Sequence, residues 1–375
     1  MENSIYKSKE YDYFDSALAE LLYVVIEFAL VGILVFLIKF GIIPSGSLVS
    51  TLASLVVEFS FFATVLIVSK ARKKSFLEAT RLNKKITTTQ GFLILAISVI
   101  TLYGFSPLTN SFMSVLDVVG YNSDSSFEIG SWARYFFYIF SVCAVPAFCE
   151  EMLFRGLIYN GLRTWNKKAA VFVSALLFML MHGSPDQTMH QFLLGIVLAM
   201  LFAVTGSIWA SMLLHFLNNF IALTASFVLE MLSTGSVATE ETAAEVASVS
   251  ALSLILSLFI ALSIGFGVFV LLRMLIKSMK KPDEKTETIT QKSEPQTSEL
   301  ALAAVGSKDD STSKEIDNSP IAEPFSEKML ENEVKDLSGM STSKKHDGAA
   351  IALFVISGLY LVYEWLSAFL SGIGF

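Results

Sequence analysis

The sequence predicts an all-α fold, a polytopic bundle of about eight to nine transmembrane helices with an internal polar cavity. Of the 375 residues, 53% are hydrophobic and only 16% are charged, whereas about a quarter of the residues in soluble domains are charged. Apolar stretches close to the roughly 20 residues that cross a bilayer recur along the chain. A few ionisable residues lie inside these stretches, which indicates a polar interior. No basic nucleic-acid-binding patch is present, so the lipid bilayer, and not a nucleic acid, is the expected surrounding partner.

Nine apolar stretches are candidate spans by length and composition. They cover 18–43, 47–69, 90–112, 132–158, 168–182, 189–205, 207–231, 250–278 and 349–371. The stretch 168–182 is short for a span and ends in His182-Gly-Ser-Pro. Because glycine and proline stop helices, we expect this segment to tilt or to end partway through the bilayer.

Basic residues predict the orientation of the chain. The stretch 69–85 and the end of the eighth span are rich in Lys and Arg, whereas the loops 113–130 and 232–249 contain acids and neither Lys nor Arg. The positive-inside rule therefore places the N-terminus in the cytoplasm and the C-terminus outside. The N-terminal residues show no cleavable signal peptide, so we expect the first span to be retained in a multi-pass protein of the cell membrane.

Composition divides the chain into five parts. Residues 282–347 are rich in Lys, Glu, Ser and Thr and poor in aromatic residues, which predicts a disordered cytoplasmic insertion that cannot bury enough apolar surface to fold. The other expected parts are N-terminal spans at 1–129, a core at 130–235 that holds the intramembrane polar residues, an eighth span at 236–281 and a C-terminal span at 348–375.

Three clusters of polar residues lie in the apolar stretches of the core, where each ionisable group is a candidate functional residue. Glu151 and Arg155 are four residues apart, so they face each other across one helical turn, and Glu150 points to a different face. His215 and Asn219 are also one turn apart, and Asn218 is a partial substitute for Asn219. The third cluster is His182, and we expect all three clusters to meet in one cavity at similar depth.

Other polar residues receive simpler interpretations. His190 is expected at the membrane interface, and His346 is expected to be solvated. Glu27 and Glu58 either bond between helices or line a path. Cys143 and Cys149 are expected to be packing residues, because neither their spacing nor their surroundings suggest a metal site or a reactive thiol. No GxSxG motif accompanies the serines on apolar helices, which are Ser174, Ser207 and Ser211.

The ordered set of motifs resembles one protease family. EExxxR (Glu150, Glu151, Arg155), FxxxH (Phe178, His182) and HxxxN (His215, Asn219) resemble the CPBP intramembrane proteases. That family includes the type II CAAX prenyl endopeptidases and bacterial relatives linked to bacteriocin processing, immunity and lysostaphin resistance. The resemblance covers roughly residues 130 to 235 and implies an α-helical membrane endopeptidase with a cavity that faces the cytosol.

By position, the resemblance assigns a role to each motif residue. Glu150 would activate the attacking water with help from His182, and His215 and Asn219 would stabilise the oxyanion. The remaining pair, Glu151 and Arg155, would orient the motif and balance its charge. The expected substrate is a membrane-associated protein or peptide.

A divalent metal is an alternative part of this mechanism. Glu150, His182 and His215 form a His₂Glu set of the kind that holds catalytic Zn²⁺. A metal-free mechanism remains open beside it, because HExxH is absent. Two further functions stay open: a non-catalytic immunity or scaffold protein of the same fold, and a transporter, although no inverted repeat is visible.

Overall fold

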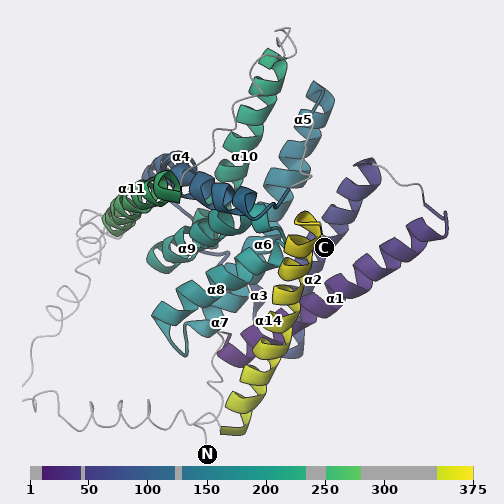
Figure 1. The fold of residues 1–375 in the computed structure, drawn as a ribbon. Helices are drawn as coiled ribbons and strands as arrows, with labels where there is room; N and C mark the ends of the chain where they lie inside the picture. The colour runs from purple at the N-terminus through teal and green to yellow at the C-terminus, as the bar shows by residue number, and fades with distance from the viewer. Residues whose placement is uncertain (1–10, 44–46, 123–128, 234–250, 280–343, 375) are drawn as a thin grey trace, which may run out of the picture. The chain divides into compact units, whose positions relative to one another are not determined.

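A computed structural model describes residues 11–43, 47–122, 129–233, 251–279 and 344–374, and these residues form helices and no strand (Figure 1). The predicted all-α fold is thus confirmed. The helices are α1 (Tyr13–Lys39), α2 (Ser47–Ala71), α3 (Phe76–Ala79), α4 (Thr88–Val118), α5 (Trp132–Tyr138), η1 (Ile139–Ala144), α6 (Val145–Leu153), η2 (Phe154–Tyr159), α7 (Asn160–Leu162), α8 (Lys167–Met181), η3 (Pro185–Gln187), α9 (Thr188–Thr205), α10 (Ile208–Ser233), α11 (Ala251–Ser278) and α14 (Lys344–Gly372).

Seven helical segments among the described residues are long and apolar enough to cross a membrane, which makes this a multi-pass membrane protein. They are Tyr13–Lys39, Ala53–Ala71, Thr88–Val118, Trp132–Leu162, Pro185–Thr205, Ile208–Leu232 and Gly348–Gly372. Each corresponds to a predicted span. The predicted span at 250–278 is helical as α11, with 28 residues, but several of its side chains lie outside the description, so its crossing stays a prediction.

The predicted span at 168–182 is not among the seven candidate spans of the described residues. It corresponds to α8, which has only 15 residues and is therefore about 22 Å long, less than the roughly 30 Å hydrocarbon core. The helix stops at its C-cap His182, after which Gly183 takes the left-handed φ of 58°. The expected early stop at the glycine and proline residues is thus observed.

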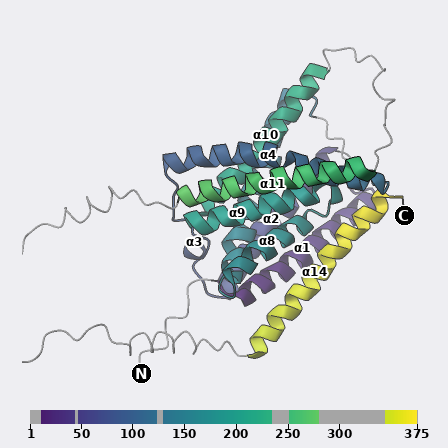
Figure 2. The same ribbon diagram turned by 60° about the vertical axis from the view of Figure 1, so that its left-hand side comes forward.

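The helices α8 and α9 form a hairpin that Figure 2 shows in the middle of the bundle. Close contact between them depends on Gly195, where a Cβ atom would lie 3.0 Å from the Ala175 Cα. At its other end α9 stops at Gly206, which has a φ of 61°. Left-handed glycine is a common helix terminator, because it has no Cβ to clash with the preceding turn.

The helical run Trp132–Leu162 contains two π-helical segments, η1 and η2, on either side of α6. Pro146 explains the first, because proline has no N–H to donate to the carbonyl four residues earlier. That carbonyl belongs to Val142, and it accepts a hydrogen bond of 3.1 Å from the Asn219 Nδ2 of α10. A side chain from another helix thus replaces a missing backbone donor.

The first helix docks through its polar N-terminal turn. Asp12 and Asp15 form a capping box at the start of α1, and the Asp15 carboxylate also accepts hydrogen bonds from Arg72 and Lys74 beyond the end of α2. Just before the helix, the hydroxyl of Tyr11 is buried and hydrogen-bonds Ser69. Burial raises the pKa of Tyr11 to about 12, because the charged phenolate is poorly solvated there.

The last helices pack on the same body. α11 lies along α4 in both views (Figures 1 and 2), with Gly104 facing Val268. From α14, Trp365 donates a hydrogen bond of 2.7 Å from Nε1 to the Oγ1 of Thr188 at the start of α9. Since α14 begins at Lys344, the last residues assigned to the insertion are helical. The rest of the predicted insertion, 282–343, lies outside the described residues.

Candidate active site

The pair Glu151–Arg155 forms the buried base of the candidate site. Both side chains are fully buried, and the Arg155 Nη1 donates to the Glu151 Oε1 at 2.7 Å. The Arg155 Nη2 donates to the carbonyl of Gly195 at 3.1 Å, and its guanidinium lies 4.4 Å from the ring centroid of Phe178. The pairing expected from the four-residue spacing is confirmed, and the arginine also ties α6 and η2 to α8 and α9.

His215 lies between the two adjacent glutamates. Its Nδ1 is 3.0 Å from the Glu151 Oε1, its Nε2 is 4.0 Å from the Glu150 Oε2, and the side chain is 2% exposed. A carboxylate partner holds a proton on Nδ1, which leaves Nε2 directed at Glu150. Glu150 and Glu151 were expected on separate faces, yet one imidazole reaches both, because its two nitrogens point in different directions.

Glu150 is buried at the junction of α6 and α2. It is 4% exposed, and its Oε2 has no hydrogen-bond partner among the described residues. The carboxyl group of Glu58 on α2 lies close enough to interact electrostatically with it. Two carboxyl groups that interact in this way can hold one proton between them. Glu58, which the sequence left between two interpretations, therefore joins the site.

His182 reaches the site from the end of α8. Its Nδ1 lies 2.8 Å from the carbonyl oxygen of Phe178, one turn back, and its ring packs on the Phe178 ring at 5.0 Å. This bond places the proton on Nδ1 and leaves Nε2 as an acceptor. His182 interacts electrostatically with His215 and His190, but no hydrogen bond or ion pair joins it to Glu150 among the described residues.

The two adjacent asparagines of α10 point to different neighbours. Asn219 donates to the Val142 carbonyl, as described above, and this is its only hydrogen bond among the described residues. Asn218 is 2% exposed, and its Nδ2 lies 3.1 Å from the Nε2 of His190. The structure therefore brings His190 against a buried side chain of the bundle, whereas the sequence suggested a position at the membrane interface.

A signal for His190 was present in the sequence. It follows His182 by eight residues across the Gly-Ser-Pro turn. A hairpin at that turn brings the two histidines back together, and α8 and α9 form such a hairpin. The signals for Glu58 and Asn218 were weaker, since only tertiary packing selects them from similar residues nearby.

The predicted metal ligands do not converge in this structure. Within the described ranges, no group of three or more His, Cys, Asp or Glu side chains is arranged to hold a metal ion. The Nδ1 of His215 bonds Glu151 and the Nδ1 of His182 bonds a backbone carbonyl, and bonds of this kind also orient metal-binding histidines, so they do not argue against a metal. As placed among the described residues, the three side chains do not form the His₂Glu arrangement, and a resident Zn²⁺ stays a prediction to be measured.

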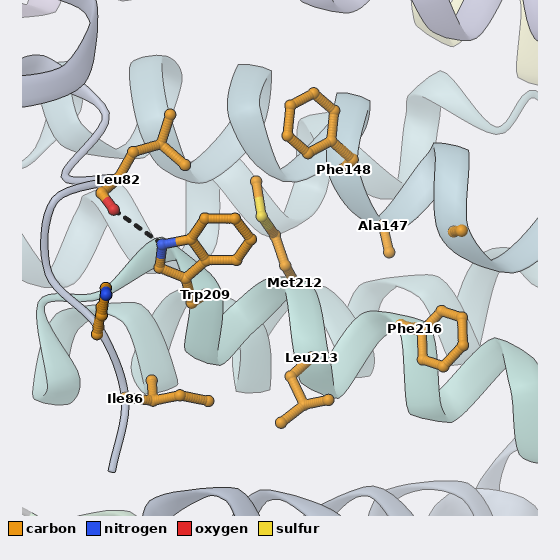
Figure 3. A pocket seen from close by; sticks show the side chains of 10 residues that line it. Leu82, Ile86, Ala147, Phe148, Trp209, Met212, Leu213 and Phe216 are labelled. Carbon is orange, nitrogen blue, oxygen red and sulfur yellow. Dashed lines mark hydrogen bonds between the residues drawn. The ribbon is translucent and has the colours of Figure 1, made fainter.

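An apolar groove runs along α6 and α10 beside these residues (Figure 3). It has a volume of about 620 Å³, and one of its walls is fixed by the Trp209 Nε1, which donates to the carbonyl of Leu82 at 2.8 Å. None of the six predicted site residues lines it. The groove nevertheless passes one helical turn from them, because Ala147 precedes Glu151 by four residues and Met212 precedes His215 by three. Its lining residues are Leu82, Lys85, Ile86, Ala144, Ala147, Phe148, Trp209, Met212, Leu213 and Phe216.

Comparison with known families supports the motif pattern. Residues 132–221 match the family model described as type II CAAX prenyl endopeptidase Rce1-like. The resemblance expected from the motifs is confirmed over this segment, which contains all six predicted site residues and also His190 and Asn218. No curated protein and no solved structure matches the chain.

Proposed function

Starting from this match over residues 132–221, we propose that the chain is a membrane-embedded endopeptidase that hydrolyses peptide bonds of membrane-associated substrates. One observation carries the proposal: the buried Glu150 faces the Nε2 of His215, whose other nitrogen is bonded to the buried Glu151–Arg155 pair. A buried carboxyl group beside an oriented imidazole is suited to general acid–base catalysis, which needs a positioned side chain that can take up and return a proton.

Glu150 is the general base of the proposed reaction. Its carboxylate takes a proton from a water molecule, and the resulting hydroxide attacks the carbonyl carbon of the peptide bond. The same carboxyl then gives the proton to the amine that leaves. Such proton transfer contributes roughly 10²–10⁴-fold to a rate. The Oε2 of Glu150, buried and without a partner among the described residues, is the atom available for this water.

His215 stabilises the negative charge that develops on the substrate oxygen by donating from Nε2, a role that requires a proton on both ring nitrogens. Its Nδ1 is held by Glu151, so the ring is oriented before the substrate arrives. Removal of one such preorganised donor costs about 10²–10³-fold in rate. His182, fixed by its bond to the Phe178 carbonyl, assists Glu150 in holding the water. Asn219 acts through the backbone of η1, because its amide donates to the Val142 carbonyl.

The apolar groove is the proposed route for the substrate. Its walls are hydrophobic apart from Lys85, whose cation suits a carboxylate or another anionic group at the end of an apolar chain. The substrate class that follows is a peptide with apolar side chains, or with an attached lipid, next to the bond that is cleaved. Comparing cleavage of a prenylated and an unprenylated peptide of the same sequence shows whether an attached lipid or the apolar side chains are recognised.

The decisive test compares the wild type with Glu150→Gln, purified in detergent and incubated with a panel of membrane-anchored peptides. We expect the wild type to cleave and the variant to lose at least about 100-fold in kcat. The matched control is Glu364→Gln, the same exchange in the span α14, outside the matched segment. Equal cleavage by wild type and Glu150→Gln would remove the catalytic assignment. A folded wild type that cleaves no peptide would favour the scaffold function.

The metal alternative has a separate test. Elemental analysis of the purified protein measures bound Zn²⁺ directly, and a chelator shows whether activity needs it. Because the three predicted ligands do not converge, we expect activity without stoichiometric metal. One zinc per chain, lost together with activity on chelation, would restore the His₂Glu assignment.

A further inference from the structure

Asn218 has a buried polar atom that the proposed mechanism does not use. The side chain is 2% exposed, and while its Nδ2 bonds the Nε2 of His190 at 3.1 Å, its Oδ1 has no hydrogen-bond partner among the described residues. Leaving a buried amide oxygen unpaired is unfavourable, and such atoms in native proteins usually have a partner. An acceptor of this kind therefore points to a donor that binds there.

The position of Asn218 places this acceptor beside the catalytic residues. It follows His215 by three residues, so both side chains leave the same face of α10. Its partner His190 belongs to α9 and interacts electrostatically with His215. The bond from Trp365 to Thr188, two residues before His190, secures the start of that helix. The acceptor is thus held from two helices next to the ring that faces Glu150.

The neighbouring asparagine is only partly buried, and its Oδ1 is not among the buried polar atoms without a partner. The Asn219 amide is directed at the Val142 carbonyl, which lost its backbone donor to Pro146. Asn218 instead has one end of its amide fixed by His190 and the other end open. The bond to His190 also sets the orientation of the amide, because an imidazole Nε2 that accepts from Nδ2 leaves Oδ1 pointing away.

We propose that Asn218 and His190 form a positioning pair for the substrate backbone. The Asn218 Oδ1 accepts a hydrogen bond from a peptide N–H close to the cleaved bond, and His190 holds the amide in the orientation that makes this possible. The pair rests on the proposed function and deepens it, since it assigns a binding contact to the substrate main chain. A neutral acceptor suits a neutral N–H donor, so the contact is independent of the substrate side chain.

The test combines protein variants with substrate analogues. A peptide that the wild type cleaves is compared with analogues in which one backbone N–H at a time is replaced by an ester oxygen. For one position we expect the wild-type KM to rise roughly threefold to tenfold, the size of one net hydrogen bond. We expect kcat to change by less than about twofold, since the contact is present in both the bound and the transition state.

In Asn218→Leu, the amide substrate should show the same rise in KM, and the ester at that position should cause no further loss. In Asn218→Asp, which keeps an acceptor oxygen, the ester penalty should persist. The matched control is Thr224→Val, a polar group on the same helix that bonds the Phe220 carbonyl and Tyr135. Thermal unfolding and size-exclusion profiles show whether each variant is folded. If Asn218→Leu does not fold, the ester penalty is measured in Asn218→Asp instead.

Two results would overturn the pair: an unchanged KM in Asn218→Leu, or an ester penalty in that variant equal to the wild-type penalty. A fall in kcat at constant KM would contradict a binding role as well. These failures differ from failure of the proposed function. A wild type that cleaves while the Asn218 variants match it refutes the pair alone, whereas a wild type that neither binds nor cleaves the peptides refutes the protease and the pair together.

Discussion

Removal of Arg155 should destabilise the protein strongly, and the structure allows the cost to be worked out. The side chain is fully buried, donates to Glu151 at 2.7 Å and to the Gly195 carbonyl at 3.1 Å. Breaking a buried ion pair by deleting one partner costs about 3–5 kcal/mol, because the other charge stays buried. We therefore expect about 3–5 kcal/mol for Arg155→Met and a similar loss for Glu151→Leu.

The double variant distinguishes an ion pair from two unrelated packing residues. Additive losses would total about 6–10 kcal/mol. With both charges gone, the remaining cost is the unpaired His215 Nδ1 and Gly195 carbonyl, about 1–3 kcal/mol each. We therefore expect about 2–6 kcal/mol for the double variant and a coupling of about 4 kcal/mol between the two sites.

Unfolding in mixed detergent micelles with increasing dodecyl sulfate, followed by the fluorescence of the four tryptophans, measures these differences. The control is Glu364→Gln, a carboxyl exchange in the span α14. Losses that add to within about 0.5 kcal/mol would show that the two residues act independently, and the account of the buried pair would be wrong.

Three further changes test the packing around the site. Gly161→Ala would place a Cβ against the Ser16 hydroxyl, so α1 should dock less well and stability should fall by about 1–3 kcal/mol in the same micelle assay. Pro146→Ala supplies a donor to the Val142 carbonyl and should straighten the helix, which we expect to lower kcat/KM about tenfold or more without loss of thermal stability. The pKa of Tyr11 is raised from 10.0 to about 12 in the folded protein. Its contribution to the free energy of unfolding is therefore fully present below about pH 10 and is lost as the pH rises towards 12. Tyr11→Phe should remove that part of the alkaline loss, about 3 kcal/mol, and a Tyr11→Phe protein that unfolds with the wild-type pH profile would contradict it.

Local rules predicted the parts of the site that lie on one helix. The four-residue spacing of Glu151 and Arg155 was enough to predict their ion pair, because side chains one turn apart are neighbours on any α-helix. Hydropathy likewise found the seven candidate spans, since each needs only a length and a composition. These features depend on sequence distance alone.

Contacts between segments that are distant in the sequence could not be predicted from the spacing of residues on one helix. Glu58 is 92 residues before Glu150 in the chain, and only the packing of α2 against α6 shows that their carboxyl groups interact. The pairing of His190 with Asn218 in place of Asn219 depends on the rotation of α10 relative to α9. A helical wheel gives the spacing of side chains on one helix but not the rotation that neighbouring helices impose.

The sequence predicted nine spans, and the difference from the seven candidate spans includes the short helix α8. Residues 168–182 have the composition of a span, yet α8 is shorter than the hydrocarbon core and forms a hairpin with α9. The turn of this hairpin carries His182 at the end of α8 and His190 near the start of α9, so it brings two of the histidines close to the site. Composition could not show this, because it counts apolar residues without regard to where the helix ends.

The π-helical turns around α6 have a consequence for the register of the chain. A π-turn accommodates one residue more than an α-turn, so every side chain after η1 is rotated relative to an uninterrupted α-helix. Conversion of η1 to an α-helical turn with all its residues kept would turn Glu150 and Glu151 by about 100° away from His215. Deletion of one residue between 139 and 144 together with that conversion would instead keep both carboxyl groups in their present direction. The position of both carboxyl groups is thus determined by one inserted residue, on a segment where no catalytic side chain lies.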